Sequence, residues 1–199
     1  MSGLHFLAWY REGLAAAGGL GPDPEDASLP ARRAVPFRVH LEGLPPAEVQ
    51  ARLYGPGEVT GLDSRQVTRM EPAPGTATAE PHFFAFAEFQ RPDLPWLFTP
   101  GAPDAQGRLQ PWLTLAVIPE PLAKLETGKG PLPVLTCPLA ELPDLADAWA
   151  WAHAQVALEA GESPGDVLED HPERALSRIV APRRMLPRRR YVACLVPTF

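Results

Sequence analysis

The densest group of side chains able to do chemistry lies at residues 166–173, in the sequence DVLEDHPE. Asp166, Glu169, Asp170 and Glu173 offer carboxylate oxygens, and His171 adds an imidazole. Such oxygen ligands suit a hard divalent cation. If a cation were bound here, the chain could be a small metal-dependent hydrolase that uses Asp166, Glu169, Asp170 and His171. The same residues also fit a solvated acidic turn. We favour the turn and therefore expect no metal site and no cofactor, with the hydrolase as an alternative.

The remaining motifs do not predict a catalytic residue. The glycines of GPGEVTG (55–61) and LETGKG (125–130) lack the spacing of a phosphate-binding loop. The histidines form no H-x-x-x-H pair, and no serine lies in a G-x-S-x-G elbow. The two cysteines, Cys137 and Cys194, fit neither a zinc motif nor a disulfide framework and are expected to be small buried hydrophobes.

Positive charge is concentrated at the C-terminal end of the chain. Residues 171–199 hold 7 of the 18 Lys and Arg residues but 1 of the 24 acidic ones. Nucleic acid is one possible partner of such a run. Binding to it is favoured by exposed aromatic side chains that stack on the bases, and the acidic rest of the chain would repel a polyanion. Arginine also pairs bidentately with carboxylates. We therefore expect protein carboxylates, of the same subunit or of a neighbour, to meet Arg183, Arg184, Arg188, Arg189 and Arg190.

Large aromatic residues add candidate anchors for packing or for contacts with a partner. Beside the arginine run, the apolar segment 190–196 is expected to be a strand, and a strand so close to Phe199 is easily left at a sheet edge where it can pair with another chain. The candidate interface residues outside the arginine run are Trp96, Trp112, Trp149, Trp151 and Phe199.

Composition predicts a folded chain with short elements. Hydrophobic residues make up 45% and charged residues 21% of the 199 residues, which is enough to bury a core. The 26 prolines and 16 glycines interrupt helices and central strands alike. The N-terminus has no signal-peptide pattern, and no window is long and apolar enough for a membrane span. We expect a cytoplasmic protein without a membrane partner.

The spacing of apolar residues predicts helices at two places. Residues 4–17 have helical spacing, and Gly18 follows them. Residues 143–160 are rich in alanine, with Asp144 as a possible N-cap and Gly161 as a possible end. Apolar residues on both sides of this second segment predict a long buried helix. Short helical turns are expected at 163–170 and 172–180.

Strands are expected between these two helices and at the end of the chain. Their ranges are 35–43, 49–55, 65–71, 82–90, 109–118, 132–138 and 190–196. Because strands and helices do not alternate, the pattern predicts an α+β fold with a mainly antiparallel sheet or partial barrel. We expect an N-terminal helix and acidic loop over residues 1–30, and a single β-rich domain over 31–199.

Three segments resemble an uncharacterised bacterial family associated with phage-tail-like contractile injection systems. They are RLYGPGEVTGLDSRQVTRMEPAPGT, EFQRPDLPWLFTPGAPDAQGRLQPWLTLAVI, and the region from LPDLADAWAWAHAQV to LSRIVAPRRMLPRRRYVACLVPTF. The resemblance implies a structural, non-enzymatic subunit at the baseplate or at an end of the tube. Its partners would be other subunits of the particle, which is assembled inside the cell and can be released from it. The resemblance assigns no catalytic residue, and it also implies relatives that continue beyond VPTF.

Overall fold

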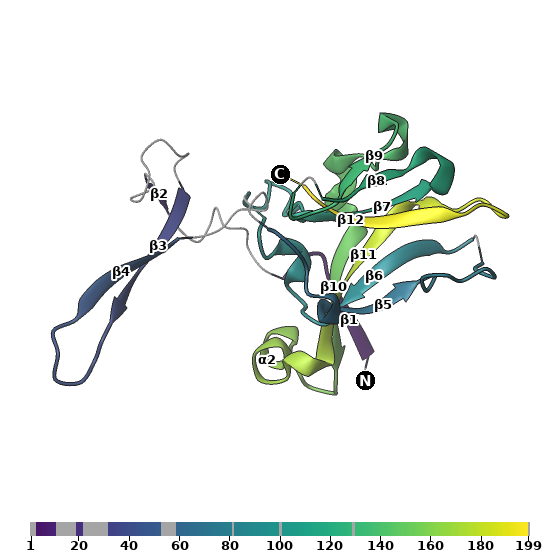
Figure 1. Ribbon diagram of the computed structural model, residues 1–199. Coiled ribbons are helices and arrows are strands. Elements are labelled where there is room, and N and C mark those ends of the chain that lie inside the picture. Colours follow the sequence, from purple (N-terminus) through teal and green to yellow (C-terminus); the bar gives the residue numbers. More distant parts are fainter. Residues whose placement is uncertain are drawn as a thin grey trace.

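The computed structural model shows a mostly β protein (Figure 1). It describes residues 3–10, 19–21, 32–52, 59–80, 82–99, 101–128 and 130–198, with the backbone alone for 19–21, 32–35 and 51–52. The strands pair antiparallel throughout these residues. The predicted α+β fold class is therefore wrong, and the error comes from the N-terminal helix and the long buried helix that the sequence predicted.

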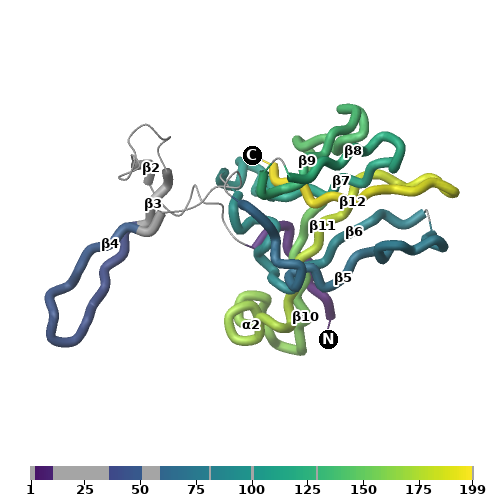
Figure 2. The backbone as a smooth tube through the Cα atoms, viewed as in Figure 1, coloured from purple at the N-terminus to yellow at the C-terminus, as the bar shows by residue number. Residues whose placement is uncertain are grey.

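A five-stranded sheet forms the centre of the body. Its strands, in spatial order, are β1 (Gly3–Leu7), β10 (Ala152–Leu158), β11 (Ala175–Arg184), β6 (Phe84–Phe89) and β5 (Val67–Glu71). The first strand of the chain thus lies beside a strand from its last third, as Figure 2 shows. The N-terminal helix predicted for 4–17 is wrong over residues 4–7, which belong to β1, and residues 11–18 lie outside the described part of the chain.

The long helix predicted for 143–160 is also wrong. A short 3-10 helix occupies Leu145–Trp151, and Asp144 caps it by accepting a hydrogen bond from the Ala146 N–H. Strand β10 follows at once, with Ala152, Ala154 and Val156 buried and the residues between them half-buried. This alternation has the two-residue period of a strand. The apolar residues that suggested a helix with two apolar sides therefore belong to two elements. Some form the buried face of β10, and the others lie in the 3-10 helix before it.

A second, smaller sheet packs beside the first. It pairs β7 (Leu113–Pro119) with β12 (Tyr191–Pro197). Six of the seven residues of β7 are buried, as expected for a strand without polar alternation. A short hairpin of β8 (Lys124–Glu126) and β9 (Val134–Thr136) follows β7 in the chain. The predicted strands at 109–118, 132–138 and 190–196 correspond to β7, β9 and β12.

The main core lies between the central sheet and the β7–β12 pair. Phe89, Trp96, Trp112, Leu115 and Ile179 are among its fully buried side chains. The helix α2 (Pro164–Asp170), capped by the Ser163 hydroxyl, covers a smaller cluster against β10. The segment expected as a helical turn at 172–180 instead enters β11 at Ala175, after a single 3-10 turn.

A third sheet stands clear of this body in Figure 1. It consists of β2 (Gly19–Gly21), β3 (Arg32–Val39) and β4 (Ala47–Arg52) in that order. We call the β3–β4 hairpin the arm. Among the described residues the arm shares no extended contact with the body. The predicted division of the chain near residue 30 stays a prediction, although β1 itself pairs with β10.

Candidate interaction surfaces

The arm carries an uncovered apolar face. Phe37 lies directly opposite Val49, and Val39 lies opposite Ala47. Because paired residues and residues two apart along a strand share a face, these four side chains lie on one side of the arm. Phe37 is 46% exposed and Val49 is 40% exposed, so no element of the described chain covers that side.

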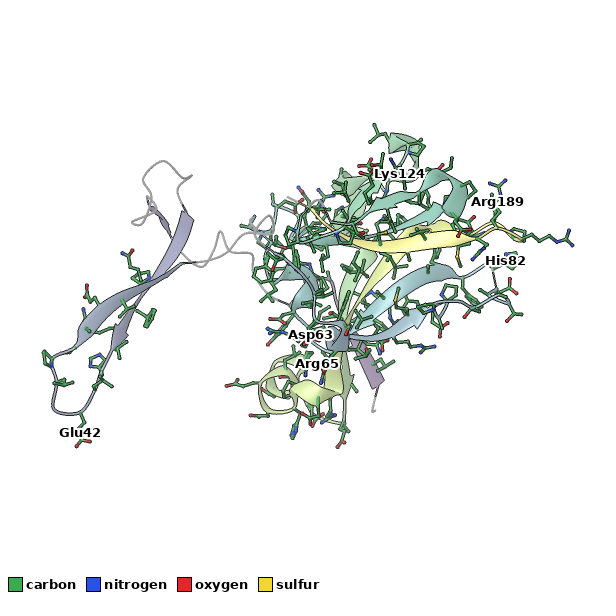
Figure 3. All side chains as sticks on the ribbon, viewed as in Figure 1. Glu42, Asp63, Arg65, His82, Lys124 and Arg189 are labelled. Atoms are coloured by element: carbon green, nitrogen blue, oxygen red, sulfur yellow. The ribbon has the colours of Figure 1, made fainter. Side chains whose placement is uncertain are left out.

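The opposite face of the arm is polar, and its tip is a turn that also exposes Leu41 and Leu44. Arg38 and Glu48 face each other across the strands, and the Arg38 guanidinium donates to the Glu48 carboxylate at 2.6 Å. Gly43 adopts a left-handed φ of 79° in the connecting turn, a conformation that glycine adopts without strain. Figure 3 shows Glu42 at the tip, away from the body. The arm is therefore amphipathic, and no described element covers its apolar side.

The arginines of the C-terminal third mostly pair with carboxylates of the same chain. The Arg178 guanidinium donates to Glu88 across the β11–β6 ladder at 2.6 Å, and it lies 4.5 Å from the centre of the Phe86 ring. Arg174 holds Glu162 through two hydrogen bonds of 2.9 and 2.8 Å. These side chains tie neighbouring strands and loops together inside the body.

The predicted interface arginines divide into three groups. Arg183 pairs with Glu141 and also donates to the Ala140 carbonyl, while Arg190 pairs with Glu120 at 3.3 Å. The Arg184 guanidinium lies 5.8 Å from the centre of the Phe84 ring. In the described part of the chain, neither Arg188 nor Arg189 contacts a carboxylate. Figure 3 shows Arg189 at the free end of the β11–β12 connection. A role in contacts with a neighbour stays a prediction for all five.

The predicted tryptophan anchors lie in two environments. Trp96 is 0% exposed and Trp112 is 1% exposed, and the Trp112 indole N–H donates to the Leu94 carbonyl at 2.6 Å, so both pack the core. Trp149 and Trp151 are half-buried near the surface, where Arg108 lies over the Trp149 ring and Phe84 packs beside Trp151. Phe199 lies outside the described residues.

Strand β12 ends as an edge strand, as the sequence predicted. It pairs with β7 alone among the described strands, so its other edge carries no neighbouring strand. The Thr198 N–H donates to the Trp112 carbonyl at 2.7 Å, which fixes the end of the strand on the body. A free edge with a fixed register can accept an added strand from another chain.

The acidic cluster at 166–173 does not assemble into a metal centre. Asp166, Glu169, Asp170, His171 and Glu173 are all exposed, on α2 and the turn after it, and His171 lies 3.4 Å from Glu173. Over the described ranges no three His, Cys, Asp or Glu side chains converge in a geometry that could hold a metal ion. The cluster therefore has the arrangement of a solvated turn.

Sequence reasoning did not identify the following two pockets, which lie on the described part of the body. The smaller, of about 220 Å³, is lined by Arg183, Arg184 and Arg189 together with Glu141 and Tyr191. The larger, of about 650 Å³, lies between the β8–β9 hairpin and the β7–β12 pair and is mainly apolar. Both cysteines line this larger pocket, as free thiols that are half-buried and not fully enclosed.

Comparison of the chain with family models, with curated proteins and with solved structures finds no match. Among the described residues, no helix has the length and apolar character needed to cross a bilayer.

Proposed function

We propose that the protein is a structural, non-enzymatic subunit of a multi-protein particle and that the arm docks on a neighbouring subunit. The observation that carries this proposal is the apolar face formed by Phe37, Val39, Ala47 and Val49, which nothing in the described chain covers. The described strands extend the β3–β4 hairpin only by the three-residue strand β2. A two-stranded hairpin alone is marginally stable in water, because it buries too little apolar surface, and a strand as short as β2 adds little. Packing against a partner supplies the missing burial.

The chemistry of the arm defines the partner surface. The apolar strip of the arm is narrow, and its other face is occupied by the internal Arg38–Glu48 pair. The matching surface is an apolar sheet or helix face on another protein. A nucleic acid would need cations on the docking face, and the four residues of this face are uncharged.

We further propose, from the resemblance to a family associated with contractile injection systems, that the particle is a phage-tail-like assembly and that the protein has a baseplate or tube-end position in it. Assembly would take place in the cytoplasm. The free edge of β12 supports the proposal by offering a second surface for contacts between subunits.

The test is co-elution of the purified chain with the purified products of the neighbouring genes in size-exclusion chromatography. We expect the wild-type chain to co-elute with one of them and Phe37→Ser to lose that complex. Leu139→Ser is the matched control, because Leu139 is 84% exposed on the body. Failure of the wild-type chain to bind any neighbour, or equal binding by Phe37→Ser, would refute the role of the arm.

A further inference from the structure

The larger pocket has the size and lining of a binding site for a small molecule. Ligand sites typically span about 300–1,000 Å³ and are mainly apolar with a few polar groups. This pocket measures about 650 Å³. Leu113, Cys194 and Val196 form its wall on the β7–β12 side, and Leu125 and Leu135 form its wall on the hairpin side. Val59, Leu62 and Leu142 complete the lining, so several separate segments of the chain bound the pocket.

The lining defines the charge of the ligand. None of the described residues around the pocket is Asp, Glu, Lys, Arg or His. Burial, and secondarily the nearby Cys137, raise the pKa of the Cys194 thiol above its ordinary value, so this group stays neutral near pH 7. A charged ligand would lose its hydration without gaining an ionic partner, which is costly. The smaller pocket, with its three arginines, has the opposite character.

A few polar groups can orient a bound molecule. Thr127 and Thr136 supply hydroxyls, and Cys137 and Cys194 supply thiols, from both walls. Leu125 is 49% exposed, so apolar surface on the hairpin wall is open to solvent in the free protein. A ligand that covers this surface gains free energy in proportion to the apolar area buried.

We propose that the pocket between the β8–β9 hairpin and the β7–β12 pair binds an uncharged, mainly aliphatic or aromatic small molecule. The site is independent of the arm, and its occupancy does not require the proposed assembly function.

Titration of the full chain with the uncharged fluorophore N-phenyl-1-naphthylamine tests the site. We expect saturable binding that 1-decanol displaces and that decanoate, its anionic counterpart, displaces much more weakly. Leu125→Glu should weaken binding on the order of tenfold, because it removes an apolar contact and introduces a charge. Leu139→Glu, at an exposed leucine outside the pocket, should leave the affinity unchanged.

A second measurement does not depend on the folding of a variant. In the wild-type chain, 1-decanol should slow the alkylation of Cys137 and Cys194 by N-ethylmaleimide, followed by mass spectrometry. Absence of fluorophore binding, equal binding by the two glutamate variants, or thiol alkylation unaffected by 1-decanol would overturn the proposal. Loss of binding in Phe37→Ser would do the same, because it would place the fluorophore on the arm. Equal displacement by decanoate would overturn the assignment of an uncharged ligand.

Discussion

At the scale of single residues, the body satisfies most of its positive charge internally. Arg174, Arg178, Arg183 and Arg190 each contact a glutamate of the same chain. The sequence predicted carboxylate partners for Arg183, Arg184, Arg188, Arg189 and Arg190, and it left open whether the carboxylates are in the same subunit or in a neighbour. Arg183 and Arg190 have such partners in the same subunit. Spacing along the chain could not resolve this, because Arg178 and Glu88 are 90 residues apart and are brought together only by the β11–β6 register.

The Arg174–Glu162 pair gives a pH-dependent stability. The Arg174 guanidinium, and after it the backbone N–H of Glu159, lower the pKa of Glu162 from 4.5 to about 2. A carboxyl group whose pKa is lower in the folded state stabilises that state above the pKa of the unfolded chain. This stabilisation is complete above about pH 4.5 and is lost as the pH falls to about 2.

We therefore expect Glu162→Gln to unfold at lower urea concentration than the wild type at pH 6, and at the same concentration as the wild type near pH 2. The measurement is tryptophan fluorescence during urea unfolding over this pH range. Glu120→Gln is the control, since Glu120 pairs with the 86% exposed Arg190 side chain and should change the unfolding midpoint little. A constant difference between Glu162→Gln and the wild type over the whole range would contradict the assigned pKa.

At the scale of elements, β10 explains the main error of sequence reasoning. Alanine is a strong helix former and a weak strand former, so an alanine-rich segment with a capping aspartate predicts a helix. In the structure, Ala152 and Ala154 lie buried in the central sheet and belong to the main core, where a small side chain fits. The two-residue alternation of AHAQVAL was the available signal, and the composition of the segment obscured it. Strands rich in aromatic or branched residues, such as β6 and β7, were predicted correctly.

The strand assignment of β10 predicts different effects at neighbouring alanines. Ala154 is 0% exposed, whereas Ala157, on the other face of the strand, is half-buried. Ala154→Leu should destabilise the protein by about 1–3 kcal/mol through overpacking, and Ala157→Leu by less than about 0.5 kcal/mol. Urea unfolding of the two variants measures this difference. Equal effects would mean that the segment does not bury alternate residues.

At the scale of the whole molecule, the sequence predicted most strands but not how they divide between sheets. The strands at 35–43 and 49–55 had the same alternation as strands of the body, yet they form the arm, whose apolar face is exposed. Alternation shows that a strand has an apolar side, but it does not show which element covers that side. The larger pocket was missed for the same reason, because its walls combine segments far apart in the chain, such as those of Leu62, Leu125 and Cys194.

The separation of the arm from the body predicts that their stabilities are independent. The described tryptophans, Trp9 among them, belong to the body, and none lies in β3 or β4, so tryptophan fluorescence reports the unfolding of the body. Phe37→Ser should therefore shift the free energy of unfolding by less than about 0.5 kcal/mol. Leu7→Ser, in β1, should lower it by about 1–3 kcal/mol, because Leu7 packs against both core clusters. A large destabilisation by Phe37→Ser would show that the arm packs on the body in solution, in which case its apolar face would not be available to a neighbouring subunit.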